Sequence, residues 1–92
     1  ASDVYKRQMQ CLGTKGIDSV MVEGGATLLW SLFSDHLVNR VQAYIAPKVF
    51  GGKTAPSPVS GEGVELPSQA FLFTKPSVEV LGDDILLECE VK

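Results

Sequence analysis

The chain has 92 residues, which is enough for at most one small domain with a modest buried core. Its 45% hydrophobic and 21% charged residues are typical of an ordinary soluble globular protein and exclude the disordered and fibrous classes. The formal charge is −3, and the lysines and arginines are scattered singly without interleaved aromatic residues, which argues against a nucleic-acid-binding surface.

The two cysteines, Cys11 and Cys89, fit neither a disulfide framework nor a zinc motif, so we expect reduced thiols in a cytoplasmic protein and no metal site. No apolar run approaches the length that spans a membrane. The chain opens without Met and without a domain-like start, so we expect residues 1–8 to be partly a scar or disordered. The rest carries no linker or repeat, which predicts a single domain over residues 1–92.

Apolar residues in the first segment recur at helical spacing. Tyr5, Met9 and Leu12 lie four and three residues apart, which predicts the tail of an amphipathic helix over residues 4–12 that Gly13 ends. A turn at residues 13–16 follows. Residues 17–22 are nearly continuous in apolar character, which predicts a buried strand.

A pair of glycines separates this strand from a second predicted helix. After Gly24 and Gly25, four apolar side chains form one stripe of a 3.6-residue period, so we expect a helix that ends around Ser34. Residues 41–46 predict a second core strand, which Pro47 ends. A strand, a helix and a strand in this order predict a right-handed crossover with parallel strands, and therefore an α/β fold.

The final third of the chain predicts a loop and a hairpin. Residues 51–67 are rich in glycine and proline, which predicts a long irregular loop of the kind that often serves as a lid or binding loop. Residues 71–81 and 85–91 predict two antiparallel strands joined by a turn at residues 82–84. On the second strand, Cys89 and its alternate neighbours should face the core, while Glu88 and Glu90 face water.

The stretch of residues 19–30 offers the best candidate site. Glycines allow a ligand to approach the backbone closely, and the N–H groups that open a helix favour an anion such as a phosphate. Glu23 precedes the glycines at the carboxyl end of the predicted strand, where its carboxylate accepts hydrogen bonds from a hydroxyl- or amine-bearing ligand. This is not the GxGxxG fingerprint of dinucleotide folds.

Each candidate also has a purely structural interpretation. Gly24 and Gly25 serve a strand-to-helix turn that needs positive φ, and Glu23 is an ordinary polar residue at a strand end. The large apolar side chains of the helix suit core or pocket wall, which leaves Thr27 and Ser31 as the better polar candidates.

Other charged residues favour the structural interpretation more strongly. His36 invites a general-base role but fits a surface position at a helix end. Asp83 and Asp84 fit turn formers better than a pair of catalytic carboxylates. Lys48 fits a solvated lysine better than a phosphate ligand.

Several motifs fall in an order that resembles a known family. They are Val22-Glu23-Gly24-Gly25, Leu28-Leu29-Trp30, Leu37-Val38, Tyr44-Ile45-Ala46-Pro47-Lys48, Gly51-Gly52 and residues 81–87. From about residue 16 to its end, the chain resembles the carboxyl-terminal part of the riboflavin-biosynthesis reductase domain, which is often fused behind a pyrimidine deaminase. The resemblance implies a dihydrofolate-reductase-like mixed sheet with flanking helices, here in part.

The resemblance also implies an activity and a site. The family reduces the ribosyl group of 5-amino-6-(5-phosphoribosylamino)uracil to the ribityl form with NADPH, which transfers a hydride to the ribose C1′. It implies that Glu23 contacts this small-molecule substrate. It further implies cofactor contacts from a run of seven residues: Gly25, Ala26, Thr27, Leu28, Leu29, Trp30 and Ser31. No residue here is a candidate proton donor.

The chain departs from the family in two ways. Asn39-Arg40 stands where the family commonly has an acidic pair, and the early strands that complete the site are missing. The zinc deaminase motifs are absent too. Three hypotheses follow: an NADPH-dependent reductase represented by its carboxyl-terminal part, a non-catalytic nucleotide-binding or assembly module, and a structural fragment stabilised by homo-oligomerisation, such as a dimer, through unpaired sheet edges.

Overall fold

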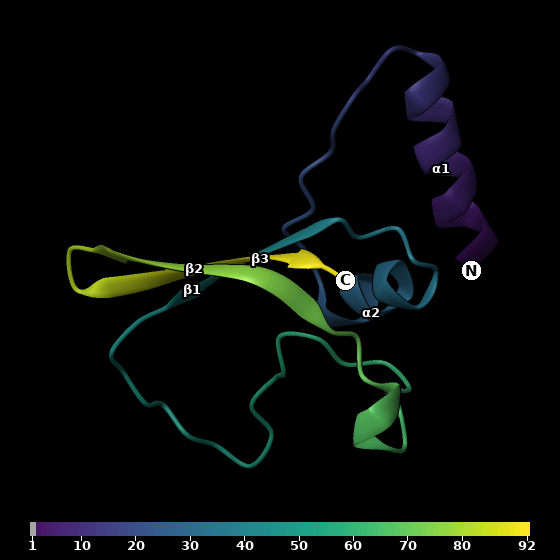
Figure 1. Ribbon diagram of the computed structural model, residues 1–92. Helices are drawn as coiled ribbons and strands as arrows, with labels where there is room; N and C mark the ends of the chain where they lie inside the picture. The colour runs from purple at the N-terminus through teal and green to yellow at the C-terminus, as the bar shows by residue number, and fades with distance from the viewer. Residues whose placement is uncertain (1) are drawn as a thin grey trace. The chain divides into compact units, whose positions relative to one another are not determined.

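The computed structural model describes residues 2–92 (Figure 1). They divide into two compact units: a helical unit of residues 2–37 and 56–63, and a sheet unit of residues 38–55 and 64–92. The expectation of one domain over residues 1–92 stays a prediction. Residues 2–8 lie within the first helix and residue 1 lies outside the described residues; a scar origin for this stretch also stays a prediction.

Helix α1 spans Ser2–Thr14, so the predicted helix at the start of the chain forms and runs two residues past its expected end. Gly13 does not end it. The terminating residue is Gly16, which has φ 81°, and the Ile17 N–H donates to the Leu12 carbonyl oxygen at 3.1 Å. With the bond from the Gly16 N–H to the Gly13 oxygen at 3.0 Å, this is a Schellman motif, in which the left-handed glycine lets the chain turn back.

Residues 17–25 form no strand, so the prediction of a strand over residues 17–22 is wrong for this chain. Three of its apolar residues, Ile17, Val20 and Met21, are instead exposed. A buried strand needs neighbours on both edges, and no strand within residues 2–92 pairs with this segment. The predicted parallel crossover is therefore absent from the described part of the chain.

Helix α2 spans Ala26–Ser34, as the apolar stripe predicts. Gly25 is its N-cap residue, and Leu32 is buried at 4% exposure. The helix ends in a second Schellman motif, in which His36 has the left-handed φ of 58° and the Leu37 N–H donates to the Leu32 oxygen at 3.0 Å. Helices α1 and α2 contact each other within the helical unit.

The sheet unit contains a three-stranded antiparallel sheet in the order β1-β3-β2. Strand β1 spans Arg40–Ile45, β2 spans Phe73–Leu81 and β3 spans Asp84–Val91. The carboxyl-terminal hairpin is thus confirmed, and its second strand lies in the centre of the sheet. Both cysteines are free thiols; Cys89 on β3 is buried and Cys11 on α1 is exposed.

The turn of the hairpin is shorter than predicted. Leu81 pairs directly with Asp84, so the turn is Gly82-Asp83 alone and Asp84 belongs to the strand. Gly82 has φ 62°, whereas Asp83 has no positive φ. This combination defines a type II′ turn, whose backbone twist matches that of the strands it joins.

The register of the sheet places apolar residues on one face and polar residues on the other. Directly paired residues share a face, so the pairs of Cys89 with Val41, of Leu87 with Ala43 and Val78, and of Ile85 with Ile45 and Val80 all lie together. The opposite face carries Leu86, Glu88 and Glu90, as predicted, with Leu86 paired to Tyr44 and Glu79. This alternation follows from the two-residue period of strands.

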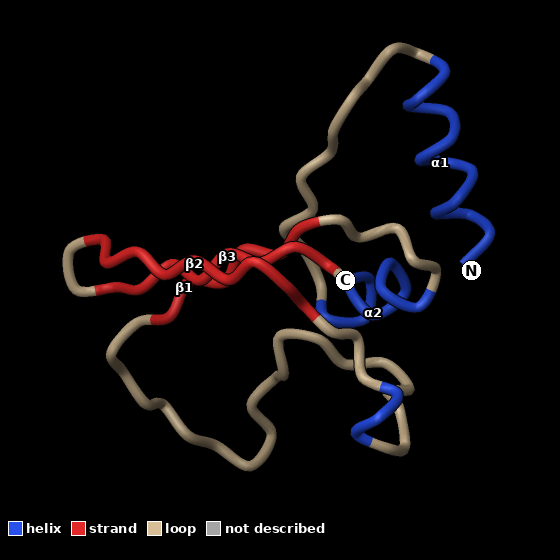
Figure 2. Tube along the Cα trace, in the orientation of Figure 1, coloured by secondary structure: helices blue, strands red, loops and turns tan. Residues whose placement is uncertain are grey.

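A long loop separates β1 from β2 (Figure 2). It holds no helix or strand from residue 46 to residue 66 and then a short 3-10 helix at Pro67–Gln69. The irregular loop that the glycine and proline content predicts is therefore confirmed. Its residues 56–63 belong to the helical unit, although the residues on either side along the chain belong to the sheet unit.

Candidate functional site

The predicted site residues form one continuous turn and helix start in the helical unit. Glu23 is exposed and directly precedes the glycine pair. Gly25 has φ 63° and ψ 120°, a conformation that side chains with a Cβ rarely adopt, whereas Gly24 has no positive φ. The two glycines thus differ: the backbone conformation requires glycine only at residue 25.

The opening of α2 offers unpaired hydrogen-bond donors. The Gly25 carbonyl accepts the first intrahelical bond, from the Leu29 N–H at 3.0 Å, and Gly25, the N-cap residue, has no side chain to cap the N–H groups of the first turn. A Cβ on Gly24 would meet no heavy atom within 4 Å, so the space before the helix is open. Backbone donors and open space are what a phosphate group requires, so this part of the chain fits a cofactor phosphate.

The hydroxyl side chains of α2 are already partly engaged. Ser31 Oγ donates to the Thr27 carbonyl oxygen at 3.2 Å, one turn back in the same helix. Thr27 Oγ1 lies 3.5 Å from Ser60 Oγ of the long loop, and both side chains are exposed. Of the two polar candidates, Thr27 therefore points out of the helix, whereas Ser31 is bound to its own backbone.

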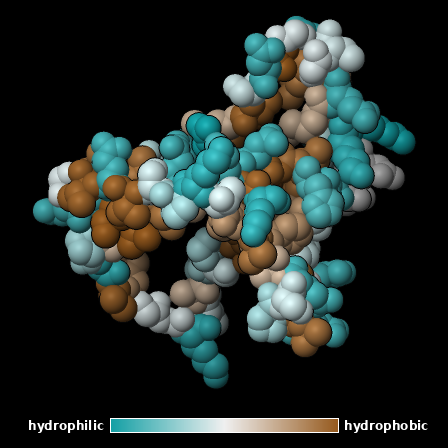
Figure 3. Space-filling model, in the orientation of Figure 1, coloured by the Kyte–Doolittle hydropathy of each residue, from teal (hydrophilic) through white to brown (hydrophobic). Residues whose placement is uncertain are grey.

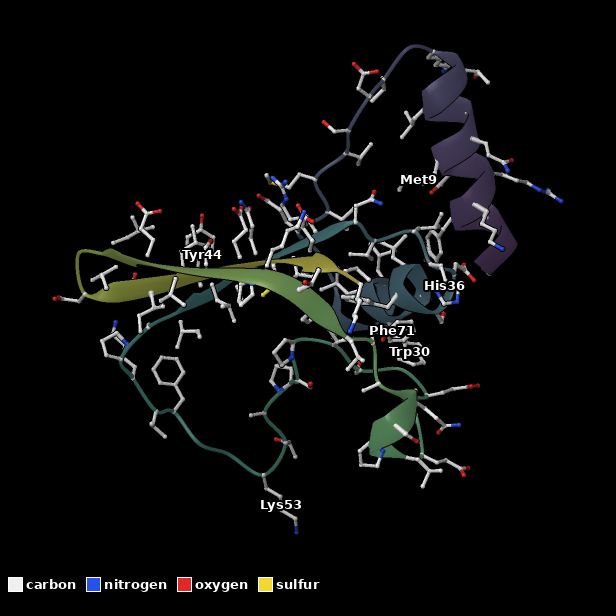
Figure 4. All side chains as sticks on the ribbon, in the orientation of Figure 1. Met9, Trp30, His36, Tyr44, Lys53 and Phe71 are labelled. Carbon is white, nitrogen blue, oxygen red and sulfur yellow. The ribbon has the colours of Figure 1, made fainter. Side chains whose placement is uncertain are left out.

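The apolar candidate residues of α2 mainly line a pocket. Leu28 lines an apolar cavity of about 430 Å³ within the helical unit, together with Leu32, Val22 and side chains of α1 such as Met9. Leu29 and Trp30 are half-buried. Figure 4 shows Met9 on α1 and Trp30 on α2. The interpretation of Leu28 as pocket wall agrees with this cavity.

The structure adds two residues that the sequence reasoning missed. The Ser60 N–H donates to the Ala26 carbonyl oxygen at 3.2 Å, and Gly61 lies against the side chain of Trp30. These contacts join segments more than 30 residues apart, so no local pattern predicts them. The available signal was the glycine-rich loop itself, which carries Gly61 and Gly63 close together.

The remaining candidates stand apart from this turn in the chain. His36 is exposed at the left-handed position after α2, which gives its backbone a structural role. Lys48 is exposed in the loop after β1, and Asp83 lies in the hairpin turn. Within residues 2–92, no group of three His, Cys, Asp or Glu side chains is placed to hold a metal ion. No helix there is both long and apolar enough to cross a membrane.

Two helices, an antiparallel sheet and a glycine turn that opens a helix define a small α/β piece with a potential anion site. A family model described as the RibD C-terminal domain matches residues 4–87. The chain therefore belongs to the RibD C-terminal domain family, that of the riboflavin-biosynthesis reductases, as the sequence motifs indicated.

Similar proteins agree with this assignment. The chain is 46% identical over 80 residues to riboflavin biosynthesis protein RibD of Actinobacillus pleuropneumoniae, which covers 87% of the chain and 21% of that protein. It is 38% identical over 77 residues to 2,5-diamino-6-ribosylamino-4(3H)-pyrimidinone 5′-phosphate reductase of Methanothermobacter thermautotrophicus, which covers 84% of the chain and 36% of that protein.

A solved structure matches the fold. Acinetobacter baumannii RibD in its form 2 superposes with a TM-score of 0.82 and 27% identity, over 95% of this chain and 24% of that one. The chain thus spans about a fifth to a third of the length of these relatives. It matches part of a dihydrofolate-reductase-like domain.

Proposed function

We propose that this chain is the carboxyl-terminal part of a reductase that converts 5-amino-6-(5-phosphoribosylamino)uracil to its ribitylamino form with NADPH. The observation that supports this most directly is the Glu23-Gly24-Gly25 turn, which opens α2 with a glycine at the N-cap, in a chain of the RibD C-terminal domain family. A relative is named as a reductase of a pyrimidinone ribosyl phosphate, which is the same substrate class.

In this proposal, each part of the turn has one task. The N–H groups of the first turn of α2 and the Thr27 hydroxyl bind a cofactor phosphate, while Leu28, Leu29 and Trp30 supply shape and apolar contact. The exposed carboxylate of Glu23 accepts hydrogen bonds from the substrate and fixes its orientation. The cofactor, when bound, supplies the hydride.

A second candidate is a non-catalytic nucleotide-binding or oligomerisation module of the same fold. It is favoured by exposed apolar residues on the sheet, such as Val78 and Val80. Under either proposal the chain forms a homo-oligomer such as a dimer. A cytoplasmic location stays a prediction.

Titration of NADPH into the 92-residue chain tests the site, with the emission of Trp30, its only tryptophan, as the readout. We expect a saturable change in the wild-type chain. Gly25→Val should abolish it, because a β-branched side chain strains the φ of 63° that places the first-turn N–H groups. Gly13→Val is the matched control and should retain it, because it makes the same change outside the turn, at a position with open space and no positive φ.

The same titration separates the candidates. A wild-type emission that does not change with NADPH would overturn the cofactor site in this chain. Saturation by NADH at the same concentrations would contradict the proposal that NADPH is the cofactor. Binding without loss of NADPH absorbance, when the pyrimidine ribosyl phosphate is added, would favour the non-catalytic module.

A further inference from the structure

The long loop returns to α2 at one segment, residues 56–63, which we name the strap. Two contacts fix it to the first turn of the helix. The Ser60 N–H donates to the Ala26 carbonyl oxygen at 3.2 Å, and the Ser60 and Thr27 hydroxyl oxygens lie 3.5 Å apart. These contacts explain why the strap groups with the helical unit while both of its flanks group with the sheet unit.

The closest contact of the strap is between Gly61 and Trp30. A Cβ built on Gly61 would lie 2.7 Å from the Trp30 Cβ and would overlap two atoms of the indole ring. No other glycine within residues 2–92 has a comparably close neighbour; the next distances are 3.7 Å, at Gly25 and Gly52. The absence of a side chain at residue 61 is therefore what allows the backbone to come this close to Trp30.

We propose that the strap is a positioning element for α2 and that Gly61 is the residue that lets the strap pack against Trp30 of this helix. Seated, the strap covers one side of Trp30 and fixes the orientation of its indole, and Ser60 holds the helix start through Ala26. If the proposed function is correct, the strap is then one wall of the cofactor site. The strap's seating itself does not depend on the cofactor.

A pair of glycine variants in the 92-residue chain isolates the contact. Gly61 and Gly63 have φ 77° and 72°, so an alanine at either residue meets similar strain in φ. Only at Gly61 does it also meet Trp30, because nothing lies within 4 Å of a Cβ on Gly63. Gly63→Ala is therefore a matched control for Gly61→Ala.

Two readouts without cofactor report the strap directly. We expect Gly61→Ala, and not Gly63→Ala, to shift Trp30 emission to the red and to raise its quenching by acrylamide. We also expect faster cleavage after the exposed Glu62 by a glutamate-specific protease, resolved by mass spectrometry. Equal changes in both variants, or no change in either, would overturn the proposal, because backbone strain alone would then account for the data.

A double variant covers the case in which Gly61→Ala loses its helical circular dichroism. Trp30→Gly removes all three atoms that the new Cβ would meet. The helical signal of Trp30→Gly/Gly61→Ala should therefore equal that of Trp30→Gly alone, and a further loss in the double variant would contradict the strap. Titration with NADPH is a separate test. No binding by the wild-type chain overturns the cofactor proposal, while quenching and proteolysis still decide the strap.

Discussion

At the scale of single residues, left-handed backbone positions mark where the chain must turn sharply. Both helices end in Schellman motifs, but α1 uses Gly16 at the left-handed position and α2 uses His36. Histidine is among the residues that tolerate positive φ, yet its Cβ still costs energy there. The chain therefore stores strain at the end of the helix that opens with the candidate site.

The variants His36→Gly and His36→Ala should differ in stability. Both remove the imidazole and its contacts, so their difference reports the strain at φ 58° less the larger unfolded-chain entropy of glycine. We expect the glycine variant to be more stable by about 1 kcal/mol, because it adopts the left-handed region without strain. Urea unfolding followed by circular dichroism measures this difference. An alanine variant as stable as the glycine variant would contradict the left-handed end of α2.

Single residues also show where prediction from sequence succeeds. The need for glycine at Gly25 was predictable, because it stands between an apolar run and an apolar helical stripe. The need for glycine at Gly61 was not, because its reason is the indole of Trp30, 31 positions away. Likewise, no local pattern indicated that Gly24 would differ from Gly25 in φ. The local spacing of residues predicts turns, whereas contacts between residues distant in the sequence are known only from the structure.

At the scale of elements, the same distinction separates the segments that formed from the one that did not. Helix α2 and the β2–β3 hairpin depend on neighbours close in sequence, and both were predicted. The strand expected over residues 17–22 depends on partner strands, and no strand within residues 2–92 pairs with this segment. An apolar run predicts burial, but a strand also requires partners for its backbone hydrogen bonds.

Strand β2 contains a proline and a lysine that break its pairing. The register shifts between Thr74 and Ser77, which leaves Lys75 and Pro76 in a bulge, and Lys75 has φ 51°. A proline cannot donate to a sheet ladder, so it fits an edge strand at a bulge. The bulge brings Lys75 Nζ to 3.3 Å from a Glu90 carboxylate oxygen on β3, and Arg40 of β1 lies 3.8 Å from the other.

Glu90 thus links the three strands on their polar face, but we expect the link to be weak. Its side chain is 40% exposed and that of Lys75 is 75% exposed, so solvent screens the attraction. Glu90→Gln should lower the free energy of unfolding by less than about 1 kcal/mol, and the loss should shrink in high salt. Glu79→Gln on β2 is the control, because no ion pair forms there within the described residues. A loss that persists in 1 M salt, where the Debye length is about 3 Å, would contradict a screened surface pair.

At the scale of the whole chain, burial is sparse. Within the described residues, only Leu32 and Cys89 are buried apolar side chains, one in each unit. On the apolar face of the sheet, Val78 is 66% exposed and Val80 is 71% exposed. Figure 3 shows apolar side chains gathered at the turn end of the hairpin. Contiguous exposed apolar surface of this kind marks an interaction site, which supports the proposed homo-oligomer.

Neighbouring substitutions on β2 test whether this face drives association. Ser77 and Val78 lie on the same edge strand but on opposite faces, and a lysine at either adds the same charge. Light scattering should give a mass above that of one 9.9 kDa chain for the wild type and for Ser77→Lys. Val78→Lys should lower the mass toward the monomer, because association would bury the new charge against apolar surface. If both variants lower the mass, the contact between chains would involve the edge of β2 instead of its apolar face, because a lysine on either face protects an edge from pairing.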